Sequence, residues 1–275
     1  MKSRLFFVIL LSLYLILTFT STHADDYIEE EIIEQTLAFS PGDELLLKAV
    51  NGDIQIKTWN KEKVHIYAHK KAKAHSEEEA LELLEIVTVE IDSKPGHLKI
   101  WTHHPKNFKM RKKSINISYT LTVPQKIHLD LQSVNGNIDV PATSGSVETG
   151  TVNGNIDVSE THGAVKSETV NGKIHLIAIV GSVQAQTVNG TIDIDIQSVD
   201  EDGIQAQTVN GKINLSLPSD IRAKLRASTQ NGNIQTDFPL TVRGWIGKTA
   251  KGQINGGGPS ISLQTLNGGI RLKQR

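Results

Sequence analysis

Four side chains capable of acid–base or metal chemistry recur at one point of a repeated segment: Asp139, Asp157, His175 and Asp193. Each of them directly follows the isoleucine of an Asn-Gly-x-Ile motif. If the repeats stack as neighbouring strands, these side chains lie about 4.8 Å apart in a row on one sheet face. Such a row could ligate a divalent cation, or act as acid and base on a polysaccharide, as paired carboxylates do in glycoside hydrolases.

A solvated strand face is the alternative explanation of this row, and we favour it. The row lacks the cluster of Arg or Lys side chains expected beside a polysaccharide-cleaving site. Histidines elsewhere, among them His65 and His69, have no carboxylate or third histidine at the spacing of a metal site. The chain has no cysteine, which excludes zinc–thiolate centres, thiol catalysis and disulfides. We therefore predict a protein that is not an enzyme and that holds no metal or cofactor.

The row depends on internal repeats, which are the strongest signal in the sequence. Asn-Gly pairs recur about 18 residues apart at first and about 21 residues apart later, with an isolated early copy at residue 51. We expect Lys251-Gly252 and the last Asn-Gly pair to be degenerate terminal copies. Each pair is expected to form a corner with positive φ angles, which glycine tolerates, and with the asparagines in a hydrogen-bonded ladder. The corner residues are Asn51, Gly52, Asn135, Gly136, Asn153, Gly154, Asn171, Gly172, Asn189, Gly190, Asn210, Gly211, Asn231, Gly232, Asn267 and Gly268.

Alternation of apolar and polar residues gives each repeat an inside and an outside. A single repeat cannot be stable, because ordering about 18 residues costs on the order of 27 kcal/mol and three buried aliphatic side chains return only about 5 to 9 kcal/mol. The repeats must therefore stack. In the unit that begins at Gly181, the residues expected to point inward are Val183, Ala185, Thr187, Ile192 and Ile194.

The repeats predict an all-β fold, a single-stranded β-solenoid or β-helix with coils of about 18–21 residues. An antiparallel meander is the alternative, because Asn-Gly is also a strong signal for a two-residue hairpin. Extra residues at 198–202 enter at one loop position while the corner stays intact, which favours the solenoid. The valine before each corner then points away from the core, where it forms an apolar stripe or tucks under the corner.

The first 130 residues differ from the repeats. Lys2 and Arg4 precede an apolar run that is shorter than the roughly 20 residues of a membrane span, so residues 1–24 are expected to be a cleaved signal peptide. Residues 25–130 are predicted to form a β-rich capping region with one short helix that begins after Ser76. Residues 131–275 are predicted to form the repeat solenoid, continuous with that cap. A basic segment at 107–113 is expected to be a solvated loop, and the alternative is a contact with anionic headgroups or glycans.

The corner motif, its copy at residues 51–54, the acidic helix and the segment at residues 119–124 together resemble the bacterial "putative adhesin" domain family. This is a family of unknown function with Thr-Val-Asn-Gly-x-Ile repeats, related to the head domains of autotransporter-type adhesins. The resemblance covers roughly residues 40–272. It implies a β-helical envelope domain with an adhesive or scaffolding role, and it supplies no catalytic residues.

We therefore expect an exported protein of the bacterial envelope, in the periplasm, on the outer surface or secreted. Its partner is expected to be a protein or glycan of the envelope, and a formal charge of −1 argues against nucleic acid and other polyanions. Membrane contact is expected only through an uncleaved signal peptide, and we make no prediction of oligomeric state. Two alternatives stay open: a carbohydrate-active enzyme that uses the Asp and His row, and an envelope-stress accessory protein.

Overall fold

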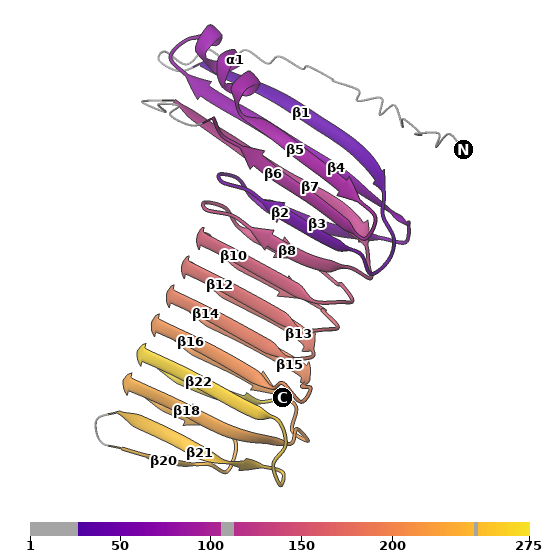
Figure 1. Ribbon diagram of the computed structural model, residues 1–275. Coiled ribbons are helices and arrows are strands. Elements are labelled where there is room, and N and C mark those ends of the chain that lie inside the picture. The colour runs from indigo at the N-terminus through magenta and orange to yellow at the C-terminus, as the bar shows by residue number, and fades with distance from the viewer. Residues whose placement is uncertain (1–26, 106–112, 245–246) are drawn as a thin grey trace.

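The computed structural model describes residues 27–105, 113–244 and 247–275, which form two long β-sheets and one helix (Figure 1). The sheets have 11 and 12 strands. Along most of the molecule each repeat supplies one strand to each sheet, and we call such a pair of strands a coil. The coils stack into a rod, with the apolar side chains between the two sheets. The predicted signal peptide and most of the basic segment at 107–113 lie outside the described residues.

The strands of the central coils run parallel to their neighbours. Val147 pairs with Val165, which pairs with Val183, so equivalent residues of successive repeats lie side by side. Parallel pairing excludes the antiparallel meander for this part of the chain. In the 12-stranded sheet these strands are β8 (His128–Gln132), β10 (Val147–Asn153), β12 (Val165–Asn171), β14 (Val183–Asn189) and β16 (Ile204–Asn210). In the 11-stranded sheet they are β9 (Ile138–Val140), β11 (Ile156–Ser159), β13 (Ile174–Val180), β15 (Ile192–Ser198) and β17 (Ile213–Leu217).

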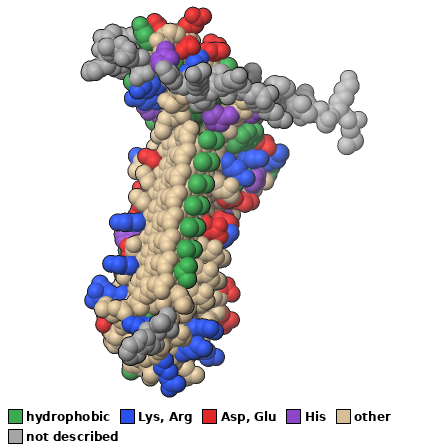
Figure 2. All heavy atoms as spheres, turned by 90° about the vertical axis from the view of Figure 1, so that its left-hand side faces the viewer, with side chains coloured by type: hydrophobic (Ala, Val, Ile, Leu, Met, Phe, Trp, Pro, Cys, Tyr) green, Lys and Arg blue, Asp and Glu red, His purple; other side chains and the backbone are tan. Residues whose placement is uncertain are grey.

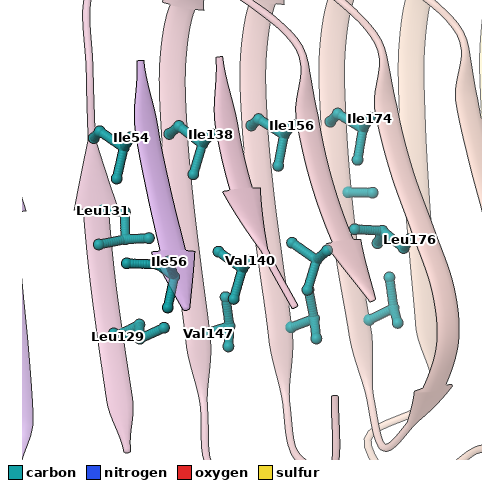
Figure 3. Packing of buried hydrophobic residues seen from close by; sticks show 14 of the residues in the cluster. Ile54, Ile56, Leu129, Leu131, Ile138, Val140, Val147, Ile156, Ile174 and Leu176 are labelled. Atoms are coloured by element: carbon teal, nitrogen blue, oxygen red, sulfur yellow. The ribbon is translucent and has the colours of Figure 1, made fainter. Parts of the chain in front are cut away.

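The core consists of columns of identical or similar side chains. Ile138, Ile156 and Ile174 stack directly on one another, and Figure 3 shows this column facing the leucines and valines of the other sheet. All five residues that alternation places inward in the repeat at residue 181 are buried: Val183, Ala185, Thr187, Ile192 and Ile194. The column arises because a strand repeats every two residues and each coil repeats its sequence in phase.

The last coil along the chain is not the last coil in space. It consists of β22 (Ser260–Asn267) and β23 (Ile270–Gln274), and it lies between the β16–β17 coil and the coil of β18 (Ala223–Asn231) and β19 (Ile234–Thr236). Asn267 pairs with Asn210 on one side and with Asn231 on the other. The prediction of a degenerate terminal copy is therefore wrong for Asn267-Gly268, which is an internal rung.

Antiparallel strands close the C-terminal end of the rod. β21 (Lys248–Ile254) pairs antiparallel with β18, and β20 (Thr241–Arg243) pairs antiparallel with β21. Lys251 and Gly252 lie within β21, so they form no corner, contrary to the sequence prediction. Antiparallel pairs also occur at the N-terminal end, so the fold is all-β with two mainly parallel sheets and departs at both ends from the predicted single-stranded solenoid.

The N-terminal region continues both sheets. The first Asn-Gly copy is not isolated, because Asn51 pairs with Asn135 and places β2 (Glu44–Lys48) and β3 (Ile54–Trp59) directly on the stack. Further strands extend the 11-stranded sheet by β7 (Ser114–Pro124), β4 (Lys63–Ala74) and β1 (Tyr27–Ala38). The 12-stranded sheet is extended by β6 (His97–His103) and β5 (Thr88–Lys94).

The predicted helix is confirmed as α1 (Glu77–Ile86), with Ser76 as its N-cap. The Ser76 hydroxyl accepts a hydrogen bond from the Glu79 N–H at 3.2 Å, which satisfies one of the free amides of the first turn. At the other end of the helix the buried Lys70 donates to the Leu84 carbonyl and pairs with Glu31. α1 thus packs on β1 and β4 at the N-terminal end of the core.

The corner glycines are required for a reason different from the predicted one. Gly52 has a positive φ, whereas Gly136, Gly154, Gly172 and the corner glycines after them do not. A Cβ atom on Gly172 would lie 1.8 Å from the carbonyl oxygen of Gly154, and the other corner glycines after Gly52 meet a neighbouring corner in the same way. A Cβ atom on Gly52 would lie 2.1 Å from the carbonyl oxygen of Ile117. Glycine is therefore required by the close approach of one corner to the next.

Substitution of a corner glycine should separate this steric requirement from the general flexibility of glycine. Gly172→Ala is expected to destabilise the protein by on the order of 3 kcal/mol, because the corner backbone must move away from Gly154. Gly150→Ala is the matched control, since Gly150 lies in the neighbouring β10 with no atom within 4 Å of the added Cβ. Urea unfolding should show a lowered midpoint for Gly172→Ala only. Equal midpoints would contradict the steric explanation.

The buried carboxyl of Glu29 should make stability depend on pH. Burial, and then repulsion from Glu77, raise the pKa of Glu29 above its usual 4.5, so the folded chain holds the proton more tightly than the unfolded chain does. Stability is therefore lost as the pH rises through the raised pKa. Glu29→Gln is expected to increase the melting temperature at pH 7, with a difference that vanishes below about pH 4.5.

The matched variant Glu31→Gln should have the opposite effect at pH 7. It removes the ionic partner of the buried Lys70 and leaves that charge uncompensated, at a cost of about 3–5 kcal/mol. Melting curves of both variants from pH 4 to pH 8 check the pair. A Glu29→Gln protein that melts below wild type at pH 7 would refute this account.

Candidate functional site

An asparagine ladder runs along one edge of the rod. Each asparagine except Asn51, which only accepts within the ladder, donates from Nδ2 to the Oδ1 of its neighbour at 2.8–2.9 Å, as Asn171 does to Asn153. Inside the same corners, threonine hydroxyls donate to corner glycine carbonyls, as Thr187 does to Gly172 at 3.3 Å. In spatial order the ladder is Asn51, Asn135, Asn153, Asn171, Asn189, Asn210, Asn267 and Asn231. The ladder therefore fixes the position of each coil relative to its neighbours along the axis of the rod.

The structure places the Asp and His row on the outer face of the 11-stranded sheet. Asp139, Asp157, His175 and Asp193 pair in that order across β9, β11, β13 and β15. His175 Nδ1 lies 3.1 Å from Asp157 Oδ1, and the two side chains are 47% and 53% exposed. Asp193 accepts a hydrogen bond from Asn214 at 2.6 Å. His175 and Asp157 are thus close enough to share a hydrogen bond, but both side chains lie on an open, solvent-exposed face.

The described ranges contain no cluster of three or more His, Asp or Glu side chains placed to hold a metal ion. His65 and His69 do face carboxylates, however. Nε2 of His65 lies 3.3 Å from Glu34, and Nε2 of His69 lies 3.0 Å from Glu30. The sequence reasoning missed these partners because they come from β1, which the pattern of residues did not identify as the neighbour of β4.

An apolar stripe follows the asparagine ladder on the outside of the 12-stranded sheet. Figure 2 shows it as one continuous line of hydrophobic side chains on a face that is otherwise polar. The valine before each corner therefore points outward, as alternation predicts, with 39–40% of its surface exposed. Ala250 does not belong to the stripe, because it is buried in β21. The valine stripe consists of Val134, Val152, Val170, Val188, Val209 and Leu266.

A long groove of ≈ 990 Å³ runs beside the valine stripe. Its second row of outward side chains is rich in amides, with Gln186, Gln207 and Gln264 paired in register on β14, β16 and β22. The groove crosses the coils from Gln132 on β8 to Thr249 on β21, along the axis of the rod. On β14, β16 and β22 the lining therefore repeats at the strand spacing of about 4.8 Å, with one apolar side chain and one glutamine on each strand. The equivalent of the glutamine is Gly150 on β10 and Glu168 on β12.

A second groove of ≈ 490 Å³ crosses the other edge of the same sheet, lined by Ser146, Lys166 and Gln184 among others. Both grooves thus lie on the sheet opposite the Asp and His row. The sequence reasoning found the valine stripe but missed the amide row. The outward position two residues before each of these valines, read across successive repeats, is the signal that would have found it.

The described chain offers no helix of sufficient length and apolar character to cross a membrane.

None of the curated proteins matches the chain. Among solved structures, the chain is similar to a "putative cell adhesion protein" from Clostridium sporogenes, with 16% identity over 88% of this chain and 99% of that one, at a TM-score of 0.34. A "putative adhesin" from Bacteroides fragilis gives 14% identity, 89% and 97% coverage and a TM-score of 0.36.

A "putative lipid binding protein" from Parabacteroides distasonis gives 12% identity, 88% and 96% coverage and a TM-score of 0.31. These structural likenesses are too low to carry an argument about the site. The family comparison is stronger, because one family model, Toastrack DUF4097, matches residues 25–178 and again residues 156–273. The two matches together span nearly all of the described coils, and the chain therefore belongs to the Toastrack DUF4097 family.

Proposed function

We propose that this chain is a non-catalytic binding protein of the bacterial cell envelope, which is exported and holds an extended glycan or protein segment in the groove beside the valine stripe. The observation that carries the proposal is the groove itself, which crosses successive coils without interruption. Family membership supports an interaction role only in general terms, since the family is one of unknown function. Export rests on the apolar N-terminal sequence alone.

The chemistry of the groove suits a partner that is itself long and repetitive. The amides of Gln186, Gln207 and Gln264 both donate and accept hydrogen bonds, so they can satisfy hydroxyl, amide or carbonyl groups of a bound chain. The valine stripe supplies apolar contact along the same line, from Val152 to Leu266. Because the backbone of every coil is fixed by the corner contacts, the groove is formed before the partner arrives, which reduces the ordering cost of binding.

We propose a non-catalytic role because of the kinds of polar side chain that line the groove. The groove is lined by neutral amides and hydroxyls with a few charged side chains, such as Glu148, Glu168 and Lys248. The side chains suited to acid–base chemistry, Asp157 and His175, lie on the opposite sheet, where both are about half exposed. The carboxylates that do line the groove, Glu148 and Glu168, both pair with Lys166, at 2.6 and 3.6 Å, so the proposal gives them no acid–base role.

A photo-crosslinking amino acid at Gln207 should identify the partner on intact cells. We expect capture of one envelope glycan or protein from Gln207 and none from the same amino acid at Asp157, which faces outward on the opposite sheet. Purified mature protein on a glycan array distinguishes the two kinds of partner. Equal capture from both positions, or none from Gln207, would count against the groove.

Filling the groove should weaken binding of the captured partner. Gln207→Trp places a large ring over the amide row and is expected to weaken binding at least about 10-fold, since the partner then loses contacts on both sides of that coil. Asp157→Trp is the control with an equally large side chain on the other sheet. Unchanged affinity of Gln207→Trp, measured by calorimetry or surface binding, would rule out the groove as the site.

A further inference from the structure

The small net charge of the chain conceals a strong separation of charge along the rod. Residues 218–275 contain nine Lys and Arg against two Asp, a formal charge of +7. Residues 27–217 contain 18 Lys and Arg against 26 Asp and Glu, a formal charge of −8. The expectation that the protein attracts no polyanion used the net charge of the whole chain, and the charges of the two parts taken separately are a reason to consider a polyanion at the positive end.

The fold gathers the positive charges at one end. Lys224 and Arg226 on β18, Lys251 on β21 and Arg243 on β20 are exposed on adjacent strands, and we call these four residues the basic end. Figure 2 shows Lys and Arg side chains collected around the lower end of the rod. Within the described ranges, none of the four has a carboxylate within salt-bridge distance.

Like charges lie directly opposite one another in the basic end. Arg226 pairs in register with Lys251, an arrangement that is unfavourable on an exposed sheet face unless an anion lies over it. Further positive charge lies on the outer face of the other sheet, where Arg271 and Lys273 extend from β23. Positive charge on both faces of the same end fits a broad negative surface better than it fits a ligand confined to one groove.

We propose that the basic end docks on an anionic lipid bilayer, so that the rod stands on the membrane by its C-terminal strands. The acidic remainder of the rod is repelled by the same surface, which favours contact through the end rather than through the side. Each Lys or Arg close to an anionic membrane strengthens binding roughly fivefold. The attraction falls off within a Debye length, so only residues at the end take part.

Vesicle flotation with the mature chain tests the proposal. We expect binding to phosphatidylcholine vesicles that contain about one-third phosphatidylglycerol, no binding to phosphatidylcholine alone, and release when salt is raised from about 0.05 to about 0.5 M. The triple variant Lys224→Gln, Arg226→Gln, Lys251→Gln should bind about 100-fold more weakly. A triple variant with the same change in net charge, Lys57→Gln, Lys61→Gln, Lys63→Gln, alters exposed lysines far from the basic end and should bind normally.

A second measurement reports orientation without altering any charge. Because the chain has no cysteine, Thr241→Cys and Ser93→Cys each carry a single fluorophore, at the basic end and at the opposite end of the rod. We expect lipid-dependent quenching only at residue 241.

Equal quenching at both ends, equal binding of the two triple variants, or no preference for anionic vesicles would overturn the proposal. Binding to dextran sulfate but not to vesicles would also overturn it and assign the basic end to an anionic glycan. Gln207→Trp should leave vesicle binding intact, so membrane docking by the basic end and partner binding in the groove can be tested independently.

Discussion

The backbone of each corner lies almost in contact with the backbone of the next corner, and the rest of the rod depends on that approach. A corner glycine such as Gly172 leaves room for the carbonyl oxygen of Gly154, and Thr169, in the same coil as Gly172, donates its hydroxyl to that same oxygen. The asparagine amides tie the coils together on the outside of the same corner. A slip of one residue would place a Cβ on a carbonyl and turn the core isoleucines outward, so each coil has one register.

Local features of the chain were predictable because they follow from alternation and phase. The inward positions of the repeat at residue 181, the outward valines and the helix cap at Ser76 each depend on a few neighbouring residues. The order of the coils was not predictable, because every Asn-Gly corner presents the same contacts. Asn267 can pair with Asn210 or with Asn231, and in the structure it pairs with both.

Features assembled from several coils were also beyond the sequence. The amide row of the groove takes one glutamine from each of the neighbouring strands β14, β16 and β22, and the basic end joins strands that run in opposite directions. The corner glycines show a different difficulty. Glycine was expected on grounds of backbone angle, while the atom that requires it belongs to another coil. The sequence alone was enough to predict glycine at these corners, but not the contact with the next coil that requires it.

The ends of the two sheets show why the stacking stops. The edge strand β1 carries four glutamates, and the edge strand β5 carries charged residues such as Glu90 and Asp92. At the other end, the outermost strands β19 and β20 are only three residues long. Short or charged edges make poor templates for a further strand. The edge strands therefore disfavour addition of strands from a second molecule, although the central coils stack readily on copies of themselves.

The placement of the β22–β23 coil also sets an order of assembly. Coils from the N-terminal end can add one after another as the chain emerges, but β18, which pairs with β21 on one side, gains its neighbour on the other side only when residues 260–267 arrive. Until then β16 and β18 both present unpaired backbone groups across an empty slot. A product cut short by a few dozen residues keeps those open edges and is exposed to proteases and aggregation. Only a chain that includes the β22–β23 coil can pair the edges of β16 and β18, so a chain shortened before residue 260 leaves both edges open.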